Sequence, residues 1–183
     1  MQKITKTLAI LFLLTGAAAT ASAQALTGED IKAQFVKDWE RAKAYTQEYL
    51  DAMPANKYGA KAVDSTRSFA QQMLHLSTGN IFLISAATDE KPASAAFSQD
   101  LEKRPGAQSK DSVVYYVNAS YDFAIASIKK LDPNKLGEVV GQRNKASRYV
   151  WLLKAFEHQT HHRGQTTIYI RLQGIRPPNE RLF

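Results

Sequence analysis

Beyond residue 26, apolar residues recur along the chain at steps of three and four, which is the spacing of amphipathic helices. The first predicted helix begins after Thr27, an N-cap residue with Asp30 three positions on, and it ends at Pro54. Its expected buried face consists of Ile31, Phe35, Trp39, Ala42, Tyr45 and Tyr49.

Three further helices follow from the same spacing. The second begins near Ser65, the third covers residues 112–131, and the fourth covers residues 147–172 with Gly174 as its C-terminal stop. The expected buried positions are Phe69, Met73, Leu76, Asn80 and Leu83 in the second helix, Val113, Val117, Tyr121, Ala124 and Ile128 in the third, and Trp151, Ala155, His158, His162, Gln165, Tyr169 and Leu172 in the fourth.

The connections between these helices differ in length. Residues 86–108 lack periodicity and are rich in Ala, Ser, Lys and Pro, so we expect a long connection with one helical turn near residues 97–101. Residues 133–145 form a second loop. No strand is expected, although the β-branched run Val113–Val117 leaves that assignment open. The predicted fold class is all-α, a four-helix bundle with long connecting loops.

The first 23 residues have the three parts of a secretory signal peptide. A basic start with Lys3 and Lys6 is followed by an apolar run at residues 8–14 and by Ala-Ser-Ala at residues 21–23. We expect cleavage there, which leaves residues 24–183 as one domain that is exported to the periplasm or secreted. The apolar run is shorter than the ~20 residues that cross a bilayer, so no stable membrane anchor is expected.

Composition and charge exclude several classes of function. The chain has no cysteine, which rules out disulfides, thiolate metal sites and a cysteine nucleophile, so a metal ion would need nitrogen or oxygen ligands. Removal of the leader lowers the net charge from +7 to +5, and the basic residues are interspersed with acidic ones. No basic stripe or nucleic-acid-reading motif is present, so no nucleic-acid partner is expected.

The candidate chemistry lies in the histidines. His158 and His162 are four residues apart in the fourth helix, which places their Cβ atoms about 5–6 Å apart and lets two imidazoles share one ion. Both fall on the face expected to be buried. His75 lies at the edge of the apolar stripe of the second helix, where Gly79 leaves space one turn later. His161 lies on the flank and is assigned to the surroundings of the site or to the surface.

Two interpretations of these histidines stay open at this point. Polar side chains in a bundle core can fix the register of the helices. Alternatively, a bound metal compensates for burying several imidazoles, each of which costs about 1–3 kcal/mol when it lacks a partner. The spacing H-x-x-x-H also occurs in zinc proteases, but Gln159 replaces the glutamate that serves them as a base. No nucleophile elbow of serine hydrolases and no phosphate-binding glycine loop are present.

Two segments together form a recognisable pair of motifs. The first is Phe69–His75 in the second helix. The second is the run His158-x-x-x-His162-Arg163-Gly164-Gln165, followed by Tyr169, Arg171, Gly174, Pro177 and Pro178. They resemble the signature of the DinB-like (YfiT-type) proteins, and the resemblance covers essentially the whole chain after the leader.

The resemblance implies an up-up-down-down-like bundle that holds a divalent ion, usually zinc or nickel, through His75, His158 and His162. Arg163 and Gln165 are expected to have chiefly structural roles, such as orienting a ligand or a pocket. Members of the family include thiol-dependent S-transferases and isomerases, and many others are classed as metal-dependent hydrolases. Because bacterial thiol cofactors are cytosolic, export of this chain argues against a transferase.

We therefore expect an exported metal-dependent hydrolase that acts on a small molecule. Three imidazoles leave a divalent ion at least one open position, as in catalytic sites. The alternatives are a non-catalytic metal- or ligand-binding bundle and a thiol S-transferase-like enzyme, and a homodimer is left open. The general base is unassigned, since Glu157 points off the buried face and Tyr121 is only a candidate for a pocket wall.

Overall fold

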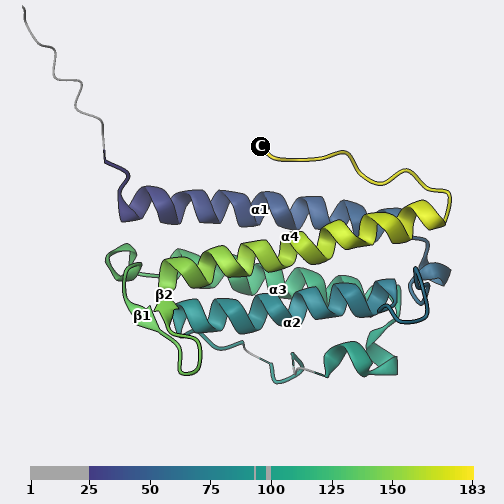
Figure 1. Ribbon diagram of the computed structural model, residues 1–183, viewed down its shortest axis with the longest axis horizontal. Coiled ribbons are helices and arrows are strands. Elements are labelled where there is room, and N and C mark those ends of the chain that lie inside the picture. The colour runs from purple at the N-terminus through teal and green to yellow at the C-terminus, as the bar shows by residue number, and fades with distance from the viewer. Residues whose placement is uncertain (1–24, 93, 98–99) are drawn as a thin grey trace, which may run out of the picture.

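The computed structural model describes residues 25–92, 94–97 and 100–183, and Figure 1 shows its four long helices. They are α1 (Gly28–Ala52), α2 (Phe69–Thr88), α3 (Lys110–Lys130) and α4 (Arg148–Leu172). The predicted all-α four-helix fold is confirmed. The predicted leader lies outside the described residues. Among the helices of the described part, none is both long and apolar enough to span a bilayer.

Local hydrogen bonds decide where the helices begin. Thr27 caps α1 as predicted, in a capping box with Asp30. The start of α2 comes later than the position predicted near Ser65, because Ser68 is the N-cap and its hydroxyl accepts the backbone N–H of Gln71. The side chains of Ser68 and Gln71 therefore fix the first turn of α2, one turn before His75.

The helices run up, down, down and up, as Figure 1 shows. Helix α2 is antiparallel to α4, since the Tyr169 hydroxyl near the end of α4 donates to the Arg67 carbonyl just before α2 (2.7 Å). This order differs from the up-up-down-down-like order that the resemblance implied. The physical reason is that residues 53–68 fold into a compact turn around the 3₁₀ helix η1 (Ala55–Lys57) and reverse the chain. Residues 89–109 instead run back along the whole length of α2, about 30 Å for a helix of 20 residues. Helix α3 therefore begins at the same end of the bundle as α2 and runs in the same direction.

The two longer connections contain more structure than the sequence pattern predicted. Residues 89–109 include the 3₁₀ helices η2 (Leu101–Lys103) and η3 (Pro105–Ala107), so the expected helical turn comes slightly later in the chain, while residues 98–99 are not described. After η4 (Pro133–Lys135), β1 (Val139–Val140) pairs antiparallel with β2 (Ala146–Ser147). The prediction of no strand is wrong there, because two-residue strands are too short to show an alternating pattern.

Arg148 joins the end of the hairpin to the end of α2. Its guanidinium donates to the Ala87 carbonyl (2.9 Å) and to the Asp89 carboxylate (2.6 Å), and it also pairs with Glu138 (3.0 Å). Asp89 ends α2 in the left-handed conformation with a φ of 61°. This buried arginine therefore fixes how α4 starts against α2, which in turn sets the register between the two helices that carry the histidines.

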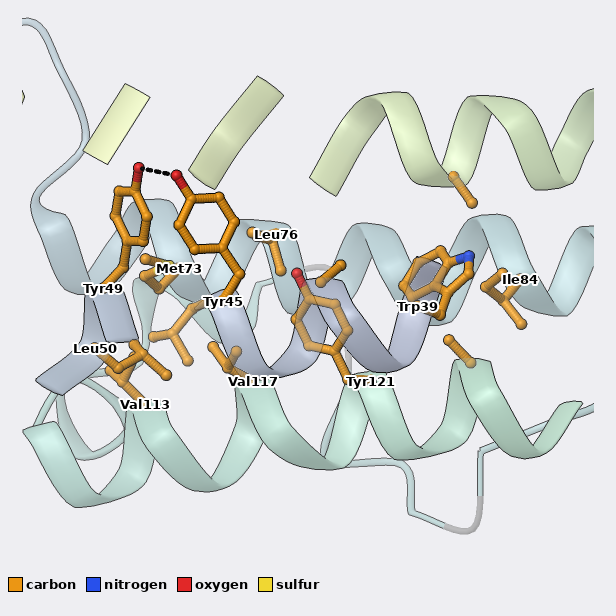
Figure 2. Close-up of a cluster of buried hydrophobic side chains, with 14 of the residues drawn as sticks. Trp39, Tyr45, Tyr49, Leu50, Met73, Leu76, Ile84, Val113, Val117 and Tyr121 are labelled. Carbon is orange, nitrogen blue, oxygen red and sulfur yellow. Dashed lines mark hydrogen bonds between the residues drawn. The ribbon is translucent and has the colours of Figure 1, made fainter. Parts of the chain in front are cut away.

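Aromatic side chains fill the centre of the bundle (Figure 2). Trp39 from α1 and Tyr121 from α3 are fully buried and meet edge to face, with ring centroids 5.6 Å apart. The run Val113–Val117, left open as a strand, is part of α3. Helix α2 packs most extensively against α4, and this contact contains the candidate site.

Candidate metal centre

Helices α2 and α4 bring the three predicted histidines together. The ring centroid of His162 lies 4.6 Å from that of His75 and 4.4 Å from that of His158, and the rings of His75 and His158 are 5.4 Å apart. One ring nitrogen from each histidine can be chosen so that all three atoms lie within 4.8 Å of one another. The three side chains therefore form a group that could hold a metal ion.

The position of the His158 ring depends on Gly79 in α2. A Cβ atom built on Gly79 would overlap the His158 imidazole, with Cε1, Nδ1 and Nε2 of that ring as its three nearest atoms. A glycine inside a helix carries a cost of roughly 1 kcal/mol relative to alanine. Here the missing side chain is the space that the imidazole from α4 occupies. The sequence pointed to this glycine, although it suggested space beside His75 rather than for His158.

A carboxylate from the long connection contacts His75. Nδ1 of His75 lies 2.8 Å from Oε2 of Glu102, which is part of η2. Arg67 Nε lies 3.0 Å and 3.2 Å from the two oxygens of the same carboxylate. Burial and the charge of Arg67 lower the pKa of His75, while Glu102 opposes that shift. His75 therefore stays neutral near pH 7, as a metal ligand must.

An amide chain contacts His162. Gln72, buried in α2, places its side-chain amide 2.9 Å from Nδ1 of His162, and the same amide also bonds Gln165. Gln165 in turn contacts Nε2 of His161 (3.0 Å). His161 itself is exposed, as the sequence analysis placed it. An amide presents an oxygen or a nitrogen after a half turn, so this chain serves either tautomer of His162.

The His158 ring has no such contact. Its Nδ1 is buried and has no hydrogen-bond partner in the part of the chain that the structure describes. Burial, followed by the charges of the neighbouring histidines, lowers the pKa of His158 to about 4 and that of His162 to about 3. Three neutral imidazoles, one with an unsatisfied buried nitrogen, are a donor set that fits a divalent ion.

The buried face of α4 is broader and more polar than predicted. Gln165 and Leu172 are exposed, whereas Gln159, Arg163 and Thr166 are buried. The reason is that α4 packs against three helices: the histidines point toward α2, whereas Gln159 and Arg163 bond side chains of α3 and α1. The seven-position stripe read from the sequence described only the first of these faces.

The second polar group is a hydrogen-bonded network at the bundle centre. Gln159 Oε1 accepts from the Tyr121 hydroxyl (2.8 Å) and from Arg163 Nη1 (2.7 Å), and Thr46 contacts both donors. The Arg163 guanidinium also lies over the Tyr45 ring, 4.7 Å from its centroid. Among the described residues, no carboxylate pairs with Arg163. The Arg163 guanidinium is therefore held by neutral oxygen acceptors and by the face of the Tyr45 ring, in keeping with the structural role expected for it.

Glu157 and Tyr121, the two residues considered as a base or a pocket wall, both bond to other groups than the three histidines. Glu157 is exposed and pairs with Lys154 (2.6 Å). Tyr121 is fully buried in the central network, and burial raises its pKa. The side chains that do contact the histidines, Gln72 and Glu102, were not found by sequence reasoning. Gln72 was detectable, since it lies three residues before His75 on the same helical face, but nothing in the aperiodic connection marks Glu102.

A surface cavity of about 650 Å³ adjoins the site. It lies between the start of α2, η2 and the second half of α4, and its lining includes Arg67, Gln72, Glu102, Gln165 and Tyr169. Gln72 and Glu102 contact two of the three histidines directly, and Arg67 and Gln165 contact those two residues. The cavity and the histidine group therefore share one polar wall.

Comparison with known proteins identifies the family of the chain. The sequence model of the DinB family matches residues 23–181, which is most of the chain and includes all three histidines. The chain belongs to the DinB family. No curated protein matches the sequence.

Two solved structures of the DinB type share the fold. A DinB-like protein from Bacillus cereus ATCC 10987 is 18% identical with a TM-score of 0.68, and the match covers 80% of this chain and 95% of that one. A DinB-like protein (YjoA) from Bacillus subtilis is 18% identical with a TM-score of 0.62, and the match covers 82% and 96%. At this identity the likeness establishes the shared bundle of the DinB family and no more.

The contact between Gly79 and His158 predicts the effect of a single methyl group. We expect Gly79→Ala to lower the unfolding free energy of the metal-free protein by about 1–3 kcal/mol, because the new Cβ displaces a packed ring. Gly164→Ala in α4 is the matched control, since a Cβ there meets no atom within 4 Å. The control is expected to raise stability by up to about 1 kcal/mol through helix propensity. Urea unfolding measures both, and a stabilised Gly79→Ala protein would refute the packing argument.

The lowered pKa values of His158 and His162 predict a pH dependence of stability. In the unfolded chain both rings titrate near 6.5, whereas in the folded protein they titrate near 4 and 3. Between these values the unfolded chain binds protons that the folded protein does not, so stability is present above pH 6.5 and is lost as the pH falls. Urea unfolding of the metal-free protein from pH 7.5 to 5 should show this loss. The variant His158→Gln/His162→Gln should have a flatter profile, and equal slopes would contradict the assignment.

Proposed function

We propose that this DinB-family protein is exported, binds one divalent ion, zinc or nickel, through His75, His158 and His162, and hydrolyses a small substrate with it. The observation that carries the proposal is the convergence of the three imidazoles, together with the unpartnered Nδ1 of His158. A bound ion would supply a partner for buried ring nitrogens of this group. Register-fixing polar residues would also not need three rings directed at one another.

A divalent ion with three neutral imidazole ligands keeps a coordination position open and supplies Lewis acidity to water or to a substrate group. The chain's own residues supply orientation. Glu102 holds His75, and Gln72 holds His162, each through Nδ1. Contacts of this kind fix the direction of ligand rings and are a regular feature of metal sites.

The adjoining cavity supports a small-molecule substrate. Its volume of about 650 Å³ lies in the range of pockets that enclose small ligands. Arg67 contributes guanidinium nitrogens, Gln72 and Gln165 contribute amides, and Tyr169 contributes an aromatic wall. A substrate bound there would lie next to the residues that orient His75 and His162.

The ion is tested by elemental analysis of residues 24–183, purified without a histidine tag and incubated with zinc or nickel. We expect about one ion per chain in the parent protein and none in His158→Ala/His162→Ala, because one histidine alone does not hold the ion. Circular dichroism should show similar helix content in both proteins. A parent that stays empty after incubation would refute the metal site.

Turnover separates the enzyme from the non-catalytic alternative. The metal-loaded parent and the double variant are compared on a panel of small esters, lactones and amides. Hydrolysis by the parent that disappears in the variant supports the proposal. A metal-loaded parent that is inactive on the whole panel favours a binding module.

Export is supported by the charge and apolar pattern of residues 1–23 and by the family match, which begins only at residue 23. The full chain, expressed in a Gram-negative host, should be recovered from the periplasmic or extracellular fraction with Gln24 as its first residue. N-terminal sequencing gives the cleavage position. Recovery of an uncut chain from the cytosol alone would refute the leader.

A further inference from the structure

Glu102 is held in an unusual place for an acidic side chain. It lies in η2, within the long connection between α2 and α3, and its side chain is only 14% exposed. One of its oxygens, Oε2, contacts both His75 Nδ1 (2.8 Å) and Arg67 Nε (3.0 Å). The carboxylate therefore lies between a cation and a histidine of the candidate metal centre.

Docking of the connection does not depend on this carboxylate. Leu101, the preceding residue, is completely buried and anchors η2 against the bundle. The backbone carbonyl of Glu102 accepts a hydrogen bond from the Gln108 side chain (3.0 Å). Because these contacts already hold the segment, the carboxylate is available for another role.

The chemistry of the pair allows one proton arrangement at neutral pH. An ionised carboxylate only accepts hydrogen bonds, so the nitrogen of neutral His75 that faces it must carry the proton. The other nitrogen, Nε2, then has a free electron pair. Gln72 imposes no such choice on His162, and the described residues provide no partner for Nδ1 of His158.

We propose that Glu102 is a positioning residue for the metal centre: it holds His75 in the Nδ1–H tautomer and directs the free Nε2 toward the ion. Arg67 fixes the carboxylate through its contacts with both oxygens. This inference rests on the proposed metal-binding function and assigns part of the site to the connection between α2 and α3. Under this proposal, the affinity for the ion depends on residues 89–109, although that connection contributes none of the three histidines.

The tautomer is measured directly on the metal-free protein. Long-range ¹H–¹⁵N NMR spectra at pH 7.5 distinguish a protonated ring nitrogen from an unprotonated one. We expect the Nδ1–H form for His75 in the parent and in Glu102→Gln, whose amide oxygen can still accept. In Glu102→Ala the contact is absent, and we expect the proton to be redistributed to Nε2.

Affinity for Zn²⁺ is measured by competition with a chelator in the same proteins. We expect Glu102→Ala to bind Zn²⁺ about 10- to 100-fold more weakly than the parent, the usual effect of losing a residue that orients a ligand. Glu102→Gln should fall between them, because it keeps the contact and loses the charge. Glu90→Gln is the matched control, since the Glu90 carboxylate pairs with Lys130 at the other end of the connection (3.1 Å) and contacts no histidine among the described residues. The Zn²⁺ affinity of this variant should equal that of the parent.

Arg67→Met separates positioning from simple docking. In Arg67→Met the carboxylate can still accept from His75, so we expect the Nδ1–H form to persist and Zn²⁺ binding to weaken less than in Glu102→Ala. If the carboxylate served only the ion pair with Arg67, the two variants would weaken Zn²⁺ binding equally, and His75 would keep one tautomer in every variant. Either result would overturn the inference, as would Glu102→Ala with unchanged affinity. A parent that binds no Zn²⁺ would instead refute the proposed function itself, so the two failures are distinguishable.

Discussion

The middle of α4 buries polar side chains on two sides, and the rest of the structure is arranged to satisfy them. His158 and His162 face His75 of α2, while Gln159 and Arg163 bond Tyr121 of α3 and Thr46 of α1. Each buried polar group without a partner costs about 1–3 kcal/mol, so a helix of this kind is stable only between neighbours that supply partners. The other three helices supply them from different residues.

The two sides of α4 are satisfied in different ways. Toward α1 and α3 the polar side chains of α4 find partners within the protein, because Gln159 accepts from Tyr121 and Arg163. Toward α2 the network is incomplete, because Nδ1 of His158 has no partner among the described residues. A fully satisfied network fixes a core, whereas an incomplete group of neutral imidazoles beside a cavity is suited to binding. The same helix thus serves as a structural element and carries two histidines of the candidate site.

The order of the helices gives the long connection its importance. Because α2 and α3 run in the same direction, residues 89–109 must return along the bundle, and η2 comes to lie beside the first half of α2. This return brings Glu102 to His75, 27 positions earlier in the sequence. An antiparallel pair joined by a short turn would leave that histidine without a carboxylate. The topology therefore decides which of the grouped histidines is contacted from outside the four helices.

The features that the sequence determined by itself depend on residues close together in the chain. Helix caps at Thr27 and Gly174, the four-residue spacing of His158 and His162, and the family motifs all depend on residues that are near neighbours in the chain. They were enough to predict the four helices, the all-α class and the three histidines. The two-residue hairpin strands were missed because so short a pattern carries no periodic signal.

Only the tertiary structure decided the rest, since it depends on which helix faces which. Periodicity shows that a helix has a buried face but not that Gln159 and Arg163 share a second one, because polar residues give no apolar signal. It also cannot place Glu102 beside His75, since a contact between an aperiodic connection and a distant helix is made by the path of the chain. The grouped histidines were therefore readable from spacing and the family motifs, whereas the residues that contact them were not.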